Sequence, residues 1–183
     1  METIQHNEDI VDSSKVIDMA AVGLEYCRFI EKMHTCEDIL DAFDFLRKLL
    51  PALYLKGSLL PYIEVEDNSA NERFVTEEEY EIIRTQLAKF IGDKDFFLTV
   101  PFDKNDMETT PVALSELLAD IYLDLKDFIL LLSKGTQNAK ENAVANCYYY
   151  FQVGWGERIT LALPYIHHVL STFTNDEMED SLY

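Results

Sequence analysis

The stretch from Asn138 to Thr174 decides the fold, and it reads NAKENAVANCYYYFQVGWGERITLALPYIHHVLSTFT. Although 27% of the whole chain is charged, the only Lys, Arg, Asp or Glu residues in this stretch are Lys140, Glu141, Glu157 and Arg158. A helix that is apolar on most sides is a buried helix, and a charge inside it must be paired or must bind something. We therefore expect one or two helices at the centre of a helical bundle, with Glu157 and Arg158 as candidate ion-pair or ligand-binding residues.

Aromatic residues follow a helical spacing along this stretch and place Arg158 among them. The residues that share this spacing are Tyr148, Phe151, Trp155, Arg158, Ala162, Tyr165 and Val169. One interpretation is a core stripe, in which Trp155 is largely buried and Arg158 is tied to a carboxylate. The other is a ligand pocket with aromatic walls, in which Arg158 would hold an anion with two hydrogen bonds.

The rest of the chain also carries apolar residues at helical spacing, interrupted by recognisable helix starts and ends. Thr35, Thr76 and Thr110 each resemble a helix N-cap, and Pro111 would occupy the first position of the third helix. Pro51 lies inside a helical pattern and predicts a kink or a break. Phe96–Val100 is the only strand-like run, so we expect it to be an extended connector that packs on the bundle.

These patterns predict an all-α fold, a single-domain helical bundle of five to seven helices with a central C-terminal helix. A length of 183 residues fits one domain with a substantial core. We expect residues 1–13 and 175–183, which are polar or acidic, to be frayed ends.

A row of carboxylates runs along the predicted helix that follows Thr110. Its members are Glu116, Asp120, Asp124 and Asp127, which fall within about 80° of one another on a helix. The row is either a site for a metal or a basic partner, or the solvated face of its helix. We expect Arg158 to pair with Asp120, Asp124 or Asp127, and Glu25, Glu31 or Asp44 could take their place.

The net charge of −19 limits the classes of partner. Such a surface repels nucleic-acid phosphates and anionic lipids, and it attracts basic proteins or cations. The three cysteines show no metal or redox spacing, and the start of the chain is unlike a signal peptide, so we expect a cytoplasmic protein. Glu31 and His34 have the spacing of one di-iron motif, but such sites need a second copy, so we predict no metal, no cofactor and no catalytic residues.

Three blocks of sequence resemble a bacterial family of helical domains of unknown function. They are Ala119-Asp120-Ile121-Tyr122-x-Asp124-Leu125-Lys126-Asp127-Phe128, Trp155-Gly156-Glu157-Arg158-Ile159, and Leu50-Pro51-x-Leu53-Tyr54-Leu55-Lys56. The resemblance spans residues 14–170, and the family is acidic and of similar length. It implies an all-helical fold, no assigned activity, and a less basic or His-like residue at the position of Arg158 in relatives.

Taken together, the sequence favours a non-enzymatic, acidic, helical interaction module that binds a protein partner. An immunity-protein or antitoxin-like neutraliser is one concrete form of it. A small-ligand-binding protein or enzyme that uses the aromatic and Arg158 stripe is the first alternative. An acidic mimic of nucleic acid is the second alternative. A large apolar surface patch would favour the interaction module. A concave pocket containing Arg158 would favour the ligand-binding protein or enzyme, and exposed rows of carboxylates would favour the nucleic-acid mimic.

Overall fold

The computed structural model describes residues 2–100 and 109–180 of the chain, and the side chains of residues 7–100 and 109–173. Within these ranges the helices are α1 (Glu2–Val11), α2 (Ser14–Lys32), α3 (Ile39–Ser58), α4 (Glu77–Ile91), α5 (Leu114–Ser133), α6 (Gln137–Tyr150) and α7 (Gly156–Asp180). A π-helical turn, Phe151–Trp155, joins α6 to α7, and two short strands are β1 (Phe96–Thr99) and β2 (Thr110–Ala113). The prediction of an all-α helical bundle is confirmed, but the helix that contacts the most others is α5 and not the C-terminal helix, which packs on α3 and α5.

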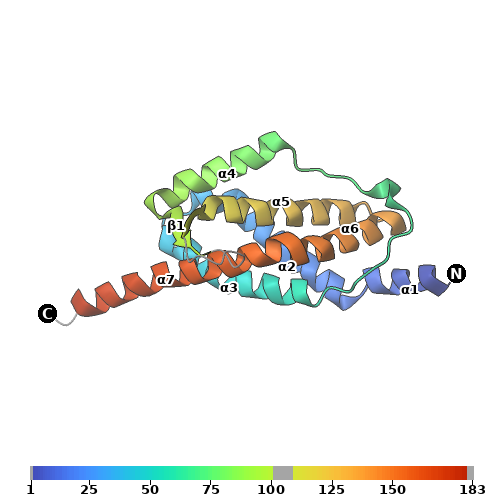
Figure 1. Cartoon of the computed structure of the whole chain (residues 1–183), viewed down its shortest axis with the longest axis horizontal. Helices are drawn as coiled ribbons and strands as arrows, with labels where there is room; N and C mark the ends of the chain where they lie inside the picture. Colours follow the sequence, from blue (N-terminus) through green and yellow to red (C-terminus); the bar gives the residue numbers. More distant parts are fainter. Residues whose placement is uncertain (1, 101–108, 181–183) are drawn as a thin grey trace.

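Helix α5 lies in the middle of the bundle and contacts α2, α4, α6 and α7, while α3 packs against α2 and α7 (Figure 1). One hydrophobic core joins these helices, and the first half of α7 contributes Ile159, Ala162 and Ile166 to it. The far end of α7 extends beyond the other helices (Figure 1). No helix among the described residues has the length and apolar character needed to cross a membrane.

The last apolar stretch is continuous, and its two α-helical parts are joined by the π-helical turn. Trp155 at the end of this turn is fully buried, as predicted, and its indole nitrogen donates to the carbonyl of Cys147 at 3.3 Å. Gly57 of α3 makes room for it, because a Cβ atom on Gly57 would lie 2.3 Å from the Trp155 ring and 2.7 Å from the Phe151 ring. The turn thus fits two large aromatic rings against a glycine on the neighbouring helix.

The strand-like run Phe96–Val100 pairs with a second strand, which the sequence analysis did not predict. Strands β1 and β2 are antiparallel, and Thr110 lies opposite Thr99. The predicted N-cap at Thr110 is therefore wrong, since α5 begins at Leu114. Asp95 caps α5 instead, because its carboxylate accepts from the backbone and hydroxyl of Ser115 at 2.7 and 2.8 Å. A residue from another part of the chain thus supplies the acceptor that the local sequence lacks.

Two other local predictions require correction and one is confirmed. Asp38 rather than Thr35 caps α3, and its carboxylate accepts from the backbone of Leu40. Pro51 does not break α3, which runs unbroken from Ile39 to Ser58. Packing of Leu50 and Leu53 in the core offsets the one backbone hydrogen bond that proline removes. At Thr76, the predicted capping box with Glu79 is present with both of its hydrogen bonds.

The two ends of the chain contain more helix than expected. Residues 1–13 were expected to be frayed, but Glu2–Val11 form α1, in which Val11 is buried and the amide of Asn7 donates to the carbonyl of Glu64. The expected frayed end at residues 175–183 is helical in α7 as far as Asp180, and residues 181–183 lie outside the described residues.

Candidate functional site

The predicted ion pair of Arg158 is present, and its partner is Asp120. The Nε atom of Arg158 lies 2.6 Å from Oδ2 of Asp120, and the two side chains are 33% and 23% exposed. The hydroxyl of Tyr80 on α4 donates to the other oxygen of Asp120 at 2.7 Å. Burial and this hydrogen bond raise the pKa of Tyr80. Asp120 therefore links α4, α5 and α7, and both of its oxygens accept hydrogen bonds within the molecule.

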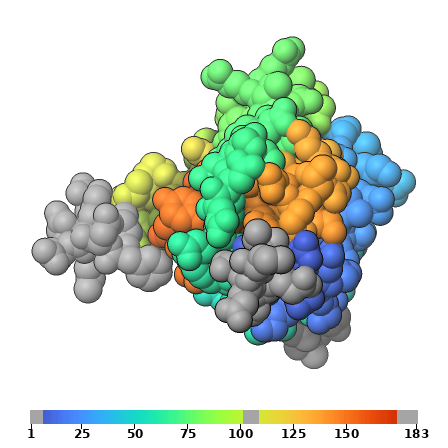
Figure 2. Space-filling view, turned by 90° about the vertical axis from the view of Figure 1, so that its right-hand side faces the viewer, coloured from blue at the N-terminus to red at the C-terminus, as the bar shows by residue number. Residues whose placement is uncertain are grey.

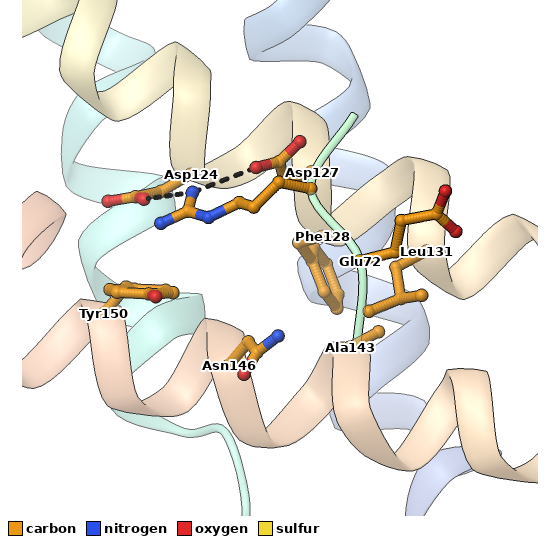
Figure 3. A pocket seen from close by; sticks show the side chains of 9 residues that line it. Glu72, Asp124, Asp127, Phe128, Leu131, Ala143, Asn146 and Tyr150 are labelled. Atoms are coloured by element: carbon orange, nitrogen blue, oxygen red, sulfur yellow. Dashed lines mark hydrogen bonds and ion pairs between the residues drawn. The ribbon is translucent and has the colours of Figure 1, made fainter. Parts of the chain in front are cut away.

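A second arginine, Arg73, holds the other two carboxylates of the row. Its Nη1 atom lies 2.9 Å from Asp127 and 3.4 Å from Asp124, and its guanidinium lies over the ring of Tyr150 at 4.7 Å. Figure 3 shows both carboxylates turned toward this guanidinium, above Tyr150 and Asn146 of α6. In the sequence Arg73 is a single arginine in a loop and belongs to no pattern, so the sequence analysis did not predict its contacts.

Asp127 and Asp124 differ in the number of hydrogen bonds that their carboxylates accept. Asp127 also accepts from the backbone of Phe74 at 2.8 Å and of Val75 at 3.0 Å, so it binds three donors. Within the part of the chain that the structure describes, Asp124 accepts a single long hydrogen bond, from Arg73, and its side chain is 11% exposed. Burial raises the pKa of Asp124 to about 6, although Arg73 and Arg158 oppose the shift. Asp124 therefore keeps its proton to a higher pH than an ordinary aspartic acid does.

The acidic row is therefore not the solvated face of its helix. Glu116 is exposed, whereas Asp120, Asp124 and Asp127 face α4, α7 and the segment that contains Arg73. We call the group formed by Arg73, Tyr80, Asp120, Asp124, Asp127 and Arg158 the arginine–carboxylate cluster. Its two arginines face three aspartates, which offsets part of the like-charge repulsion that the spacing alone would cause, although Asp120 still contributes to the raised pKa of Asp124.

The segment that carries Arg73 is a strap, residues 59–76, which links α3 to α4 and crosses α6 (Figure 2). Three asparagines spaced four residues apart on α6 lie along it. Asn138 and Asn142 donate to Asp67 at 2.5 and 2.8 Å, and Asn146 donates to Asn71 at 2.9 Å. Because residues four apart share one face of a helix, this row holds the strap in place and presents Arg73 to α5.

A cleft of about 350 Å³ opens beside the cluster, between the start of α4 and α5. Its lining residues are Arg73, Val75, Thr76, Glu77, Tyr80, Asp120 and Leu123. Arg158 is not among them, and it binds the oxygen of Asp120 that Tyr80 leaves free. The cleft thus contains the Asp120 carboxylate without its arginine partner.

The residues of the predicted aromatic stripe contact different parts of the molecule. Tyr148 packs edge-on against Tyr62 at 5.8 Å between ring centroids, Trp155 lies in the core, and Arg158 turns to α5. Tyr165 stacks on Phe97 of β1 at 4.3 Å and donates to the carbonyl of Lys94. The π-helical turn interrupts the regular spacing on which the stripe depended, so these side chains do not form one wall.

A group of exposed apolar side chains surrounds the end of α3, the strap and the π-helical turn. We call it the aromatic surface; it comprises the exposed Tyr54, Tyr62, Tyr149 and Val153, and the half-buried Tyr148 that packs against Tyr62. Tyr62 and Tyr149 are 68% and 58% exposed. The edge-on pairs Tyr54–Phe151 and Tyr62–Tyr148 connect α3 and the strap to the segment around the turn. The sequence analysis considered Tyr148 alone of these tyrosines, as part of a core stripe or a ligand pocket, because periodicity does not distinguish a core aromatic from an exposed one.

Glu31, which belongs to the single di-iron-like motif of the sequence, has a structural role. Glu31 accepts from Lys126 at 2.6 Å and from the hydroxyl of Tyr122 at 3.0 Å, so it joins α2 to α5. Among the described residues, no group of three or more His, Cys, Asp or Glu side chains could hold a metal ion. The three cysteines are free thiols, and burial raises the pKa of Cys27 to about 12.

Comparison with known proteins places the chain in a family. Residues 11–172 match the domain of unknown function DUF5063. The chain belongs to this family. Its structure is similar to the crystal structure of protein BF1032 from Bacteroides fragilis, with 32% sequence identity and a TM-score of 0.79 over 87% of this chain and 94% of that one. No curated protein matches the chain significantly. The resemblance that the three sequence blocks indicated is confirmed.

Proposed function

We propose that this protein is a non-enzymatic, acidic helical interaction module that binds a basic protein partner in the cytoplasm. The observation that carries the proposal is the aromatic surface on a molecule with a net charge of −19. Exposed tyrosines offer large, rigid contact area with a polar tip, and they are enriched where proteins bind one another. A strongly negative surface selects a positively charged partner and accelerates the encounter with it.

The arginine–carboxylate cluster supports a structural role for the charges that first suggested a binding site. Arg158 and Arg73 are already bound to Asp120 and Asp127, and Asp127 accepts from three donors. Groups that satisfy one another hold α4, α5, α7 and the strap together. The partial burial of Asp124 and Asp127 also disfavours the nucleic-acid mimic, since a mimic has to present its carboxylates in the open. The free thiols are consistent with a reducing compartment.

Site-specific photo-crosslinking in the cells that naturally contain the protein tests this proposal. A photoreactive phenylalanine analogue replaces Tyr62 or Tyr149 on the aromatic surface, or Ile82 on α4 as an exposed control. We expect one discrete protein adduct from the first two positions and none from Ile82. In lysates of the same cells the adduct should weaken as salt rises, and mass spectrometry should identify a protein with a basic surface. Adducts that are absent, or that are equally strong from Ile82, would contradict the proposal.

Small-ligand binding is the second candidate function, supported by the cleft beside Tyr80 and Asp120. A ligand there would contact the Asp120 carboxylate, so Tyr80→Phe should weaken binding and leave the fold intact. Thermal-shift screening of a metabolite collection tests this candidate, with Ile82→Ala as a control. A stabilising compound that loses its effect in Tyr80→Phe alone would favour this function over the interaction module.

A further inference from the structure

A groove lies at one edge of the aromatic surface, between α3 and the start of α7. It encloses about 230 Å³ and is lined by Tyr54, Phe151, Gln152, Gly156, Glu157 and Thr160. The ring of Tyr54 is partly exposed and meets the ring of Phe151 edge-on at 5.2 Å between centroids. Gly156 keeps the turn closed at this point, because a Cβ atom there would lie 2.4 Å from the carbonyl oxygen of Phe151. The groove is therefore a product of the π-helical turn.

The chemistry of the groove combines a carboxylate with an aromatic ring. Glu157 is exposed, and it takes part in none of the ion pairs found among the described residues. The neighbouring Arg158 does not neutralise it, since Arg158 is bound to Asp120. A cation with a flat, weakly hydrated body fits such a place, because it stacks on the ring and donates to the carboxylate.

We infer that this groove binds an arginine side chain of a basic protein partner, with the guanidinium against Tyr54 and its N–H groups directed at Glu157. The net charge of −19 disfavours an anionic occupant and favours a cationic one. Arginine is favoured over lysine because its planar guanidinium stacks on an aromatic ring and meets a carboxylate with two hydrogen bonds, whereas an ammonium is compact and strongly hydrated. The inference rests on the proposed function and assigns the anchor residue of that interaction.

Nuclear magnetic resonance with short peptides provides the test. The ¹⁵N-labelled protein is titrated with an acetylated and amidated glycine-arginine-glycine peptide. The comparison peptides carry lysine, or citrulline, which keeps the shape of arginine without its charge. We expect the arginine peptide to shift the amides of residues 54 and 151–160 in a saturable way. The lysine peptide should bind more weakly, and the citrulline peptide should not bind.

Two variants with the same change in net charge separate a site from general attraction. Glu157→Gln should weaken binding of the arginine peptide by about two- to fivefold, because it removes the ionised acceptor. Glu78→Gln, at an exposed position on α4, should leave the affinity unchanged. Tyr54→Leu should weaken binding without loss of the fold, which the amide spectrum itself reports.

Three outcomes would overturn the inference. They are shifts that do not saturate at millimolar peptide, equal effects of Glu157→Gln and Glu78→Gln, and equal binding of arginine and citrulline peptides. Tighter binding of the lysine peptide would also refute the assignment to arginine. If crosslinking from Tyr62 succeeds while the groove binds no peptide, the proposed function stands and the groove does not. If the groove binds the arginine peptide and no crosslinked adduct forms, the groove stands as an arginine site and the proposed function does not stand.

Discussion

Arg158 and Arg84 both bind a carboxylate, but their surroundings differ. Arg158 joins α7 to α5 through Asp120 with both side chains largely covered, whereas Arg84 pairs with Glu81 three residues away on the surface of α4. We expect Arg158→Met to destabilise the fold by about 1–3 kcal/mol, because it leaves a partly buried carboxylate without its cation. Arg84→Met should cost less than about 0.5 kcal/mol.

Urea unfolding of both variants measures the difference. A double-mutant cycle with Asp120→Asn should return a coupling energy for Arg158 and Asp120 that is clearly above zero. Equal, small losses for the two arginine variants would show that the Arg158 pair is as weak as a surface pair.

The raised pKa of Asp124 predicts an unusual dependence of stability on pH. Its value in the fold is about 6, above the ordinary 3.8, so the folded state binds the proton more tightly than the unfolded chain does. Between these two values the contribution of Asp124 to stability falls as pH rises, by about 3 kcal/mol at most, whereas carboxyls with a lowered pKa, such as Glu79, contribute in the opposite direction. Asp124→Asn should remove this loss and make the variant less sensitive to pH between about 4 and 6.

Unfolding free energies of the native protein and of Asp124→Asn, measured across that pH range, give the difference directly. The titration of the Asp124 side-chain carbon followed by NMR supplies an independent value. A difference between the two proteins that stays constant with pH would refute the prediction.

At the residue scale, the sequence predicted the Arg158 partner but not the Arg73 contacts. Arg158 is isolated among apolar residues, so charge restricted its partner to the acidic row or to a few carboxylates on the first two helices. The packing of α5 against α7 selects Asp120 among them. Arg73 reaches Asp127 across 54 positions of sequence, and its position depends on the path of the strap. Residue type does not encode such a path.

At the scale of elements, Gly57 and Gly23 provide a matched pair of helical glycines. A Cβ atom on Gly57 would lie 2.3 Å from Trp155, while one on Gly23 would find its nearest neighbour at 3.6 Å. We expect Gly57→Ala to destabilise the fold by about 1–3 kcal/mol through overpacking of buried rings. Gly23→Ala should be neutral or stabilise by up to about 1 kcal/mol, because alanine is the better helix former. Thermal unfolding of the two variants checks the contrast, and a loss of stability in Gly23→Ala alone would reverse it.

Asp127 fixes the strap to α5, since it accepts from Arg73 and from the backbones of Phe74 and Val75. Asp127→Ala should destabilise by about 2–4 kcal/mol, because two backbone donors and one guanidinium lose their acceptor together. Hydrogen exchange at Phe74 and Val75 should accelerate far more than exchange in α2. Unchanged exchange at these two amides would show that other contacts hold the strap.

The helices were predictable from periodicity and capping, and the errors occurred where distant residues replaced local signals. Thr110 and Pro111 have the composition of a helix start, yet they lie in β2 because β1 pairs with them and Asp95 caps α5. In α3 a local signal for a helix break is overruled, since the core contacts of Leu50 and Leu53 outweigh the effect of Pro51. Tertiary contacts decided both cases.

At the scale of the whole molecule, 34 acidic residues against 15 basic ones make self-repulsion a general cost of the folded state. We expect the melting temperature at neutral pH to rise between low and moderate concentrations of sodium chloride, because salt screens repulsion between exposed charges. Choline chloride at the same ionic strength should act equally. A rise with sodium alone would indicate a bound cation instead of screening.

The π-helical turn Phe151–Trp155 also has a consequence for how sequences of this kind can diverge. A π-helical turn holds one residue more than an α-helical turn, so everything after it is rotated by about 100° relative to an uninterrupted helix. The turn therefore acts as a phase shift between α6 and α7. Deletion of the exposed Gln152 removes this extra residue, so the segment closes as a continuous α-helix that keeps Ile159, Ala162 and Ile166 on the side of the core. Loss of one residue should thus be tolerated better in this turn than inside α6 or α7, where it would rotate the residues that follow by about 100°.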